Sequence, residues 1–184
     1  MPADDGSADT SVPTPRMLSW ARNSAAYRLG KRMHTEKQLH DAITRKARQK
    51  FEEISAEQVK ALADFAVKFG YDNMALDDTA YAEVASRSGA RSGRSKRAIA
   101  RKLTIKGIDR ETAATAVAEV DDLHAALVLA RKRAFGPFRR IEADEKRVAK
   151  ELSAFVRGGF GFDVAKAVCD MSLEDAEAIL FGEA

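Results

Sequence analysis

Cysteine is almost missing from this 184-residue chain. Cys169 stands alone, which excludes an internal disulfide and a zinc site built from cysteines. Its apolar neighbours Val168 and Met171 favour a place in the core for its side chain. A single cysteine fits a reducing compartment, and we expect a cytoplasmic protein.

Long apolar runs are missing as well. No stretch reaches the roughly 18 consecutive apolar residues of a membrane helix, so no membrane span is predicted. The N-terminal segment, residues 1–16, is polar and acidic and has no apolar centre, which excludes a secretory signal peptide. Because Pro, Gly, Ser and Asp dominate this segment, we expect it to be a disordered tail that ends at about Pro15.

Catalytic and metal-binding patterns do not occur either. His34, His40 and His124 show no ligand spacing with one another or with the cysteine. There is no assignable Ser/His/Asp or Cys/His arrangement and no glycine-rich phosphate loop. Neighbouring carboxylates on a helix diverge, so Asp77 and Asp78 are better explained as helix caps than as a catalytic pair. We therefore expect no enzymatic activity, no cofactor and no metal.

What the chain does contain is the pattern of an all-α protein. There is no sustained alternation of apolar and polar residues, the chain has only four prolines, and Ala, Leu, Lys, Arg and Glu are abundant. Apolar residues recur every three or four positions between start and stop signals. The predicted helices cover about 18–33, 36–51, 56–70, 78 onward, 96–106, 110 onward, 123–133, 143–157, 163 onward and 173–181.

Capping residues mark most of these helix ends. Thr35 and Ser55 are each followed three residues later by a glutamine, which is the pattern of a capping box. The other predicted N-caps are Ser95, Asp109, Asp122 and one of the pair Asp77 and Asp78. The glycines predicted to end helices are Gly70, Gly107, Gly158 and Gly159.

One helix junction recurs three times, with an apolar residue before it and a basic residue near the helix end. The copies are Ile43–Ala47, Leu103–Asp109 and Phe155–Gly161. Their period of roughly 50 to 60 residues predicts three tandem three-helix repeats, at 17–75, 76–121 and 122–184. Units this small must bury surface against their neighbours, so we expect an elongated, curved, monomeric body.

The first copy of the junction has Ala47 where the others have glycine. Without a residue suited to the left-handed conformation, the helix need not stop there. We predict that it continues to about Phe51 and that Arg48–Glu53 is an insertion.

The segment Arg87–Ile108 holds eight Lys or Arg and no Asp or Glu. Ile99 and Leu103 give its helix one core-facing side, and the other side is cationic. Such a face is often simply solvated, and cations near helix C-termini also suit the helix dipole. The alternative is a site for phosphate or for an acidic protein surface. No aromatic platform accompanies the run, so base stacking is not predicted.

Two further basic clusters lie at helix ends, Arg28–Arg32 and Arg131–Arg133, and we expect the three clusters to form one stripe. The predicted partner-binding residues are Arg87, Arg91, Arg94, Lys96, Arg97, Arg101, Lys102, Lys106, Arg131, Lys132 and Arg133. Trp20 and Tyr27 are left without an assignment.

Four segments together resemble one known family. They are Thr35–Leu39 (TEKQL), Leu76–Ala82 (LDDTAYA), Lys102–Ile108 (KLTIKGI) and Arg157–Val164 (RGGFGFDV). In their order and spacing they resemble the bacterial RecX regulatory proteins, over roughly residues 25–171. Ala47 departs from that pattern, and Gly158 stands where a second basic residue is common. The acidic tail lies outside the resemblance.

The resemblance implies three tandem three-helix repeats and a function that composition does not show. It implies a non-enzymatic protein that binds the RecA recombinase, chiefly as its filament on single-stranded DNA. Lying in the filament groove, such a protein restrains strand exchange, ATP hydrolysis and coprotease activity. The alternative is direct DNA binding by three-helix units that act like helix-turn-helix domains, and a weak direct DNA contact is compatible with either function.

Overall fold

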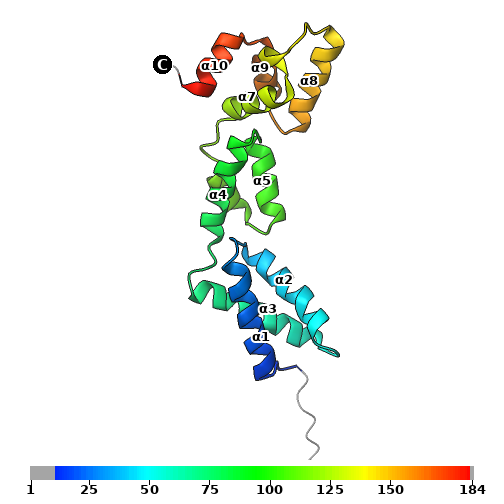
Figure 1. Ribbon diagram of the computed structural model, residues 1–184, viewed down its shortest axis with the longest axis vertical. Helices are drawn as coiled ribbons and strands as arrows, with labels where there is room; N and C mark the ends of the chain where they lie inside the picture. The colour runs from blue at the N-terminus through cyan, green and yellow to red at the C-terminus, as the bar shows by residue number, and fades with distance from the viewer. Residues whose placement is uncertain (1–10, 183–184) are drawn as a thin grey trace, which may run out of the picture. The chain divides into compact units, whose positions relative to one another are not determined.

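The computed structural model describes residues 11–182, and every regular element in that range is helical (Figure 1). The elements are α1 Pro15–Leu29, α2 Glu36–Lys50, α3 Ala56–Asp72, α4 Asp78–Arg91, α5 Lys96–Ile105, α6 Arg110–Ala116, α7 Asp122–Arg133, the short 3-10 helix η1 Gly136–Phe138, α8 Glu145–Arg157, α9 Phe162–Asp170 and α10 Leu173–Phe181. This confirms the all-α prediction. None of the described helices is both long and apolar enough to span a membrane.

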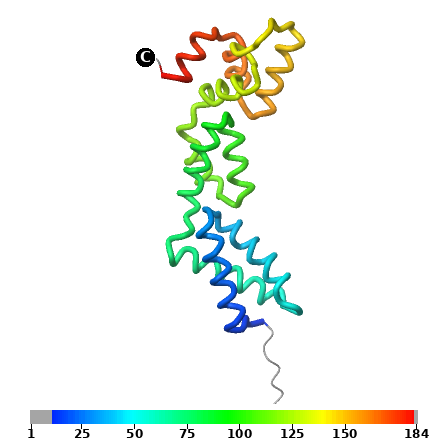
Figure 2. The backbone as a smooth tube through the Cα atoms, viewed as in Figure 1, coloured from blue at the N-terminus to red at the C-terminus, as the bar shows by residue number. Residues whose placement is uncertain are grey.

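The chain divides into two compact units, which the smooth trace of Figure 2 lets the reader follow one at a time. The first unit ends at Tyr81 and the second begins at Ala82, so the division falls within α4. The predicted limits of the three repeats stay predictions, as does the elongated, curved body.

Helix α1 begins earlier than the sequence predicts. The Thr14 side chain accepts a hydrogen bond from the Met17 amide at 3.3 Å, and Pro15 takes the first helical position, where a missing N–H costs nothing. The prediction of a disordered tail through residue 16 is therefore wrong for Pro15 and Arg16. The first ten residues of that tail lie outside the described part of the chain.

In the first unit, α1, α2 and α3 pack around an apolar core. Its fully buried members are Ala21, Ala25, Leu39, Ile43, Ala47, Leu62, Ala63 and Ala66. Both predicted capping boxes are present, at Thr35 and at Ser55. Helix α2 ends at Lys50 with Phe51 as its C-cap, as predicted from Ala47. The Phe51 ring meets Trp20 edge-on, with centroids 5.2 Å apart, so Trp20 belongs to the edge of this core.

Gly70 does not end α3, contrary to the prediction. The helix continues to Asp72, and Gly70 lies buried inside it. A Cβ atom at Gly70 would lie 2.6 Å from Cδ1 of Leu76, so the glycine lets Leu76 close against α3. The left-handed backbone conformation falls instead on Met74, with φ of 52°.

In the second unit, α7, α8, α9 and α10 enclose a second core. Its most deeply buried large side chains are Phe155, Leu127 and Val168, and the Phe155 ring meets Phe135 and Phe160 edge-on. Cys169 lies in this core at 7% exposure, as predicted, and burial raises the pKa of its thiol.

A buried ion cluster fastens η1 to α8. Glu151 is 2% exposed, and its carboxylate accepts hydrogen bonds from the Gly136 amide at 3.0 Å and from the Arg139 guanidinium at 2.7 and 2.9 Å. Its second oxygen accepts from Arg147 at 3.2 Å. Burial alone would raise the pKa of this carboxyl, but the hydrogen bonds from Arg139, Gly136 and Arg147 outweigh it and the pKa is lowered.

Two Asp-Asp pairs share one arrangement. Asp77 and Asp121 cap their own helices, accepting from Ala80 N at 2.8 Å and from Leu123 N at 2.8 Å. The second member of each pair reaches back to an earlier helix. Asp78 accepts from the first amide of α2 (2.9 Å), and Asp122 accepts from the first amide of α5 (2.6 Å). The sequence-based prediction that Asp122 caps α7 is therefore wrong. Asp121 is the cap, and the Asp122 carboxylate accepts from α5 instead.

Candidate partner-binding surface

Helix α5 is built to face the core on one side and solvent on the other. The Ser95 hydroxyl accepts from the Ala98 amide at 3.1 Å, which confirms the predicted N-cap. Ile99 and Leu103 are buried four residues apart, and Arg97 and Arg101 share the opposite, exposed face at the same spacing. The helix ends at Ile105, followed by Gly107 with φ of 95°, also as predicted.

Most of the eleven predicted contact residues are exposed, and only Lys96 and Lys106 are half-buried. Within the described part of the chain, six of the eleven side chains make no ion pair, hydrogen bond or cation–π contact. These unpaired cations are Arg91, Arg94, Arg97, Arg101, Lys102 and Arg133. Their charge is therefore available to a partner.

Four of the remaining predicted residues have contacts within the chain. Lys96 Nζ donates to the Ala118 carbonyl at 2.7 Å, and Lys132 Nζ donates to the Ser92 carbonyl at 3.0 Å. The Arg131 guanidinium lies 5.1 Å from the centroid of the Phe181 ring, and Arg87 faces Glu83 at 3.7 Å on the surface. These four side chains already have partners within the chain. The unpaired cations are therefore the stronger candidates for contact with another molecule.

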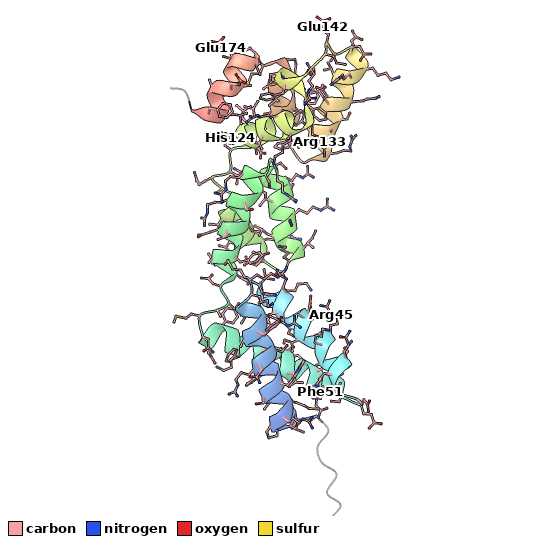
Figure 3. The ribbon with its side chains drawn as sticks, viewed as in Figure 1. Arg45, Phe51, His124, Arg133, Glu142 and Glu174 are labelled. Carbon is pink, nitrogen blue, oxygen red and sulfur yellow. The ribbon has the colours of Figure 1, made fainter. Side chains whose placement is uncertain are left out.

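The structure brings together three arginines that the sequence separates. Ser95 donates its hydroxyl proton to the Gly158 carbonyl at 2.7 Å, which joins the start of α5 to the end of α8. A pocket of about 320 Å³ opens beside this contact, lined by Arg94, Arg133 and Arg157. Figure 3 labels Arg133 at the end of α7. Arg157 was missed by sequence reasoning, although it ends the helix before the third junction, where a basic residue recurs.

The Arg28–Arg32 cluster belongs to the first unit. Lys31 Nζ lies 4.8 Å from the centroid of the Tyr27 ring. The exposed Tyr27 side chain thus makes a cation–π contact with Lys31. The single stripe expected from the three basic clusters stays a prediction.

Comparison with known proteins identifies the family. A family sequence model described as "RecX, second three-helix domain" matches residues 77–117. The regulatory protein RecX of Agrobacterium fabrum (strain C58 / ATCC 33970) is 64% identical over 176 residues, which is 96% of each chain. The chain belongs to the RecX family. The regulatory protein RecX of Myxococcus xanthus (strain DK1622) is 36% identical over 165 residues, or 85% of this chain and 88% of that one.

A solved structure agrees on the fold. The crystal structure of RecX from Lactobacillus salivarius superposes with a TM-score of 0.64 at 19% identity, covering 84% of this chain and 96% of that chain. The RecX fold of several three-helix domains is thus present here, as the resemblance implies. RecX is a family of regulatory proteins and not of enzymes. The RecX match at 77–117 contains α4, α5 and α6, so the most cationic helix belongs to the second three-helix domain.

Proposed function

We propose that this chain binds the RecA recombinase, chiefly as its filament on single-stranded DNA, and restrains its recombinase, ATPase and coprotease activities in the cytoplasm. The chain acts as a monomer in homologous recombination and the SOS response. Membership of the RecX family supports this proposal. The two relatives, which match this chain over most of their own length, are both named regulatory proteins.

The unpaired cations supply the chemistry for such a partner. A RecA filament offers both acidic protein surface and the phosphates of the DNA that it holds. Arg97 and Arg101 lie one helical turn apart on the exposed face of α5, where they can meet either kind of charge. Several modest contacts made by one chain to neighbouring filament subunits add up to tight binding.

A pull-down with purified RecA tests the proposal. The full chain is mixed with RecA alone, with RecA and nucleotide, and with RecA, nucleotide and single-stranded DNA. We expect the strongest capture in the third mixture and inhibition of the ATPase in the same samples. No capture in any mixture would overturn the proposal.

Direct DNA binding by the three-helix units is the rival function, and the same unpaired cations favour it. It requires tight binding of DNA without RecA. A gel-shift measurement on the purified chain decides between the two. A shift at chain concentrations below those that inhibit RecA supports the rival function.

A further inference from the structure

The pocket between α5, α7 and α8 carries a concentration of positive charge from three separate segments. Arg94 comes from the turn before α5, Arg133 from the end of α7 and Arg157 from the end of α8. The other lining residues are Gly93, Ala98, Leu129, Ala154, Gly158 and Phe160. The lining contains no acidic residue.

None of the three arginines makes an ion pair with any residue that the structure describes. Elsewhere in the same unit, Arg139 and Arg147 share the carboxylate of Glu151. The unit thus neutralises some of its arginines and leaves three unneutralised around one cavity. Three like charges repel one another, so an anion in the pocket would stabilise them.

Helix dipoles explain only part of this arrangement. Arg133 and Arg157 occupy the last turns of α7 and α8, where a cation is favourable. Arg94 lies directly before the N-terminus of α5, where a cation is unfavourable. Its position therefore has no structural benefit from the dipole.

Close backbone contacts hold the three segments in place. Gly93 has φ of 80°, and a Cβ atom there would lie 2.9 Å from the Leu129 amide nitrogen of α7. The hydrogen bond from Ser95 to the Gly158 carbonyl fixes the end of α8 against the start of α5. The bases of all three arginines are consequently held before any ligand arrives, which lowers the entropy lost on binding.

We propose that this pocket is a binding site for phosphate groups. A carboxylate presents its two oxygens in one plane, whereas a phosphate presents oxygens in several directions and so suits guanidinium groups that come from three segments. Phe160, the aromatic residue of the lining, is buried, so no ring is available for stacking a base. The site recognises phosphate without reading sequence.

The phosphate can belong to a nucleic-acid backbone or to a free polyphosphate. The site goes beyond the proposed RecA function. Arg94 and Arg133 are also predicted RecA contacts, but Arg157 is not, so a substitution at Arg157 tests the phosphate site separately from the RecA function.

Isothermal titration calorimetry on the full chain tests the site with two probes, sodium triphosphate and a single-stranded oligothymidine, at matched ionic strength. We expect Arg157→Gln to weaken binding of the recognised probe at least about tenfold, because a charge-assisted hydrogen bond is lost. If the probe is the oligonucleotide, the slope of log affinity against log salt should fall by about 0.7.

Arg110→Gln is the matched control, because Arg110 is an exposed arginine of the same unit outside the pocket. Binding of triphosphate alone assigns a free anion, binding of oligothymidine alone assigns a backbone phosphate, and binding of both supports the site with either source. The proposal is overturned if neither probe binds, or if Arg157→Gln and Arg110→Gln weaken binding equally. Unchanged RecA inhibition by Arg157→Gln would leave the RecA function standing whatever the calorimetry shows.

Discussion

Helices α3 and α5 treat their exposed cations in opposite ways. On α3, both lysines pair within the helix, Lys60 with Asp64 at 2.5 Å and Lys68 with Asp72 at 2.6 Å. On α5, the residue four positions after Arg97 is Arg101, another cation. The first pattern stabilises the helix that carries it, and the second weakens its helix by about 0.2 to 0.5 kcal/mol for each like pair.

The net charge is also distributed unevenly between the two units. Residues 1–81 contain twelve basic and twelve acidic residues, and residues 82–184 contain nineteen basic and sixteen acidic. The entire net charge of +3 therefore resides in the second unit. The like charges of α5 do not stabilise their own helix, and the predictions below test whether these unpaired cations serve a partner.

The largest effect is expected where paired cations meet a buried acid. Glu151→Gln should reduce the free energy of unfolding by about 3 kcal/mol, because Arg139 and Arg147 lose their counter-charge in a partly buried site. Chemical denaturation of the full chain, read by circular dichroism, measures the loss. A change below about 1 kcal/mol would mean that the cluster is energetically no different from a surface pair.

The same carboxyl predicts a pH dependence. Its folded pKa is lowered, so its contribution to stability is complete above the unfolded value near 4.5 and is lost as pH falls through the folded pKa. We expect the stability difference between the wild type and Glu151→Gln to shrink as the solution is acidified below that range. Denaturation curves at a series of pH values measure it, and a difference that grows on acidification would contradict the assignment.

Removing the unpaired cations should have the next largest effect, on function rather than on stability. The variant Arg94→Ala/Arg97→Ala/Arg101→Ala should weaken inhibition of the RecA ATPase roughly a hundredfold, because each lost contact is worth about 1 kcal/mol. The loss should become smaller as salt is raised, since screening already weakens the wild type. A folded variant with unchanged inhibition would refute the role of this charge.

The matched control removes three exposed cations from α2. Arg45→Ala/Lys46→Ala/Arg48→Ala lowers the net charge by the same amount on a helix whose first amide also donates to a later aspartate. Figure 3 labels Arg45 on this helix. We expect inhibition by this variant to match the wild type, and an equal loss in both triple variants would show that total charge matters and not the α5 face.

A smaller effect is expected at the two back-reaching aspartates. Asp122→Ala and Asp78→Ala should each cost about 1 kcal/mol, because each leaves the first amide of α5 or α2 without its carboxylate acceptor. Denaturation of each variant gives the cost. Similar values would show that the two junctions are energetically equivalent, and a loss at one alone would break that equivalence.

The smallest effect is expected for a paired surface charge of the first unit. Asp64→Asn leaves Lys60 without its partner at 2.5 Å and His40 without its contact at 3.5 Å. Exposed pairs contribute little, so the cost should be about 0.5 kcal/mol, with RecA inhibition unchanged. Thermal unfolding and the ATPase assay check both expectations, and altered inhibition would place part of the contact surface on α3.

Sequence reasoning succeeded where the determinants are local. The caps at Ser95 and Asp109 and both capping boxes depend on residues within three positions of one another. It failed where a distant residue decides. Leu76 packs so closely against Gly70 that no Cβ atom fits there. The Asp122 carboxylate accepts from the Lys96 amide, 26 residues earlier in the chain. The pocket with Arg157 was likewise not predictable, because it depends on how α8 meets α5.

The Ser95 hydroxyl has one consequence for the timing of folding. It accepts from an amide three residues away and donates to a carbonyl 63 residues further along the chain. During translation, the local partner of this hydroxyl is made together with α5, whereas its second partner is synthesised 63 residues later. The basic helix thus reaches its final surroundings only after residue 158 has left the exit tunnel, so a truncated translation product lacks the finished cationic surface.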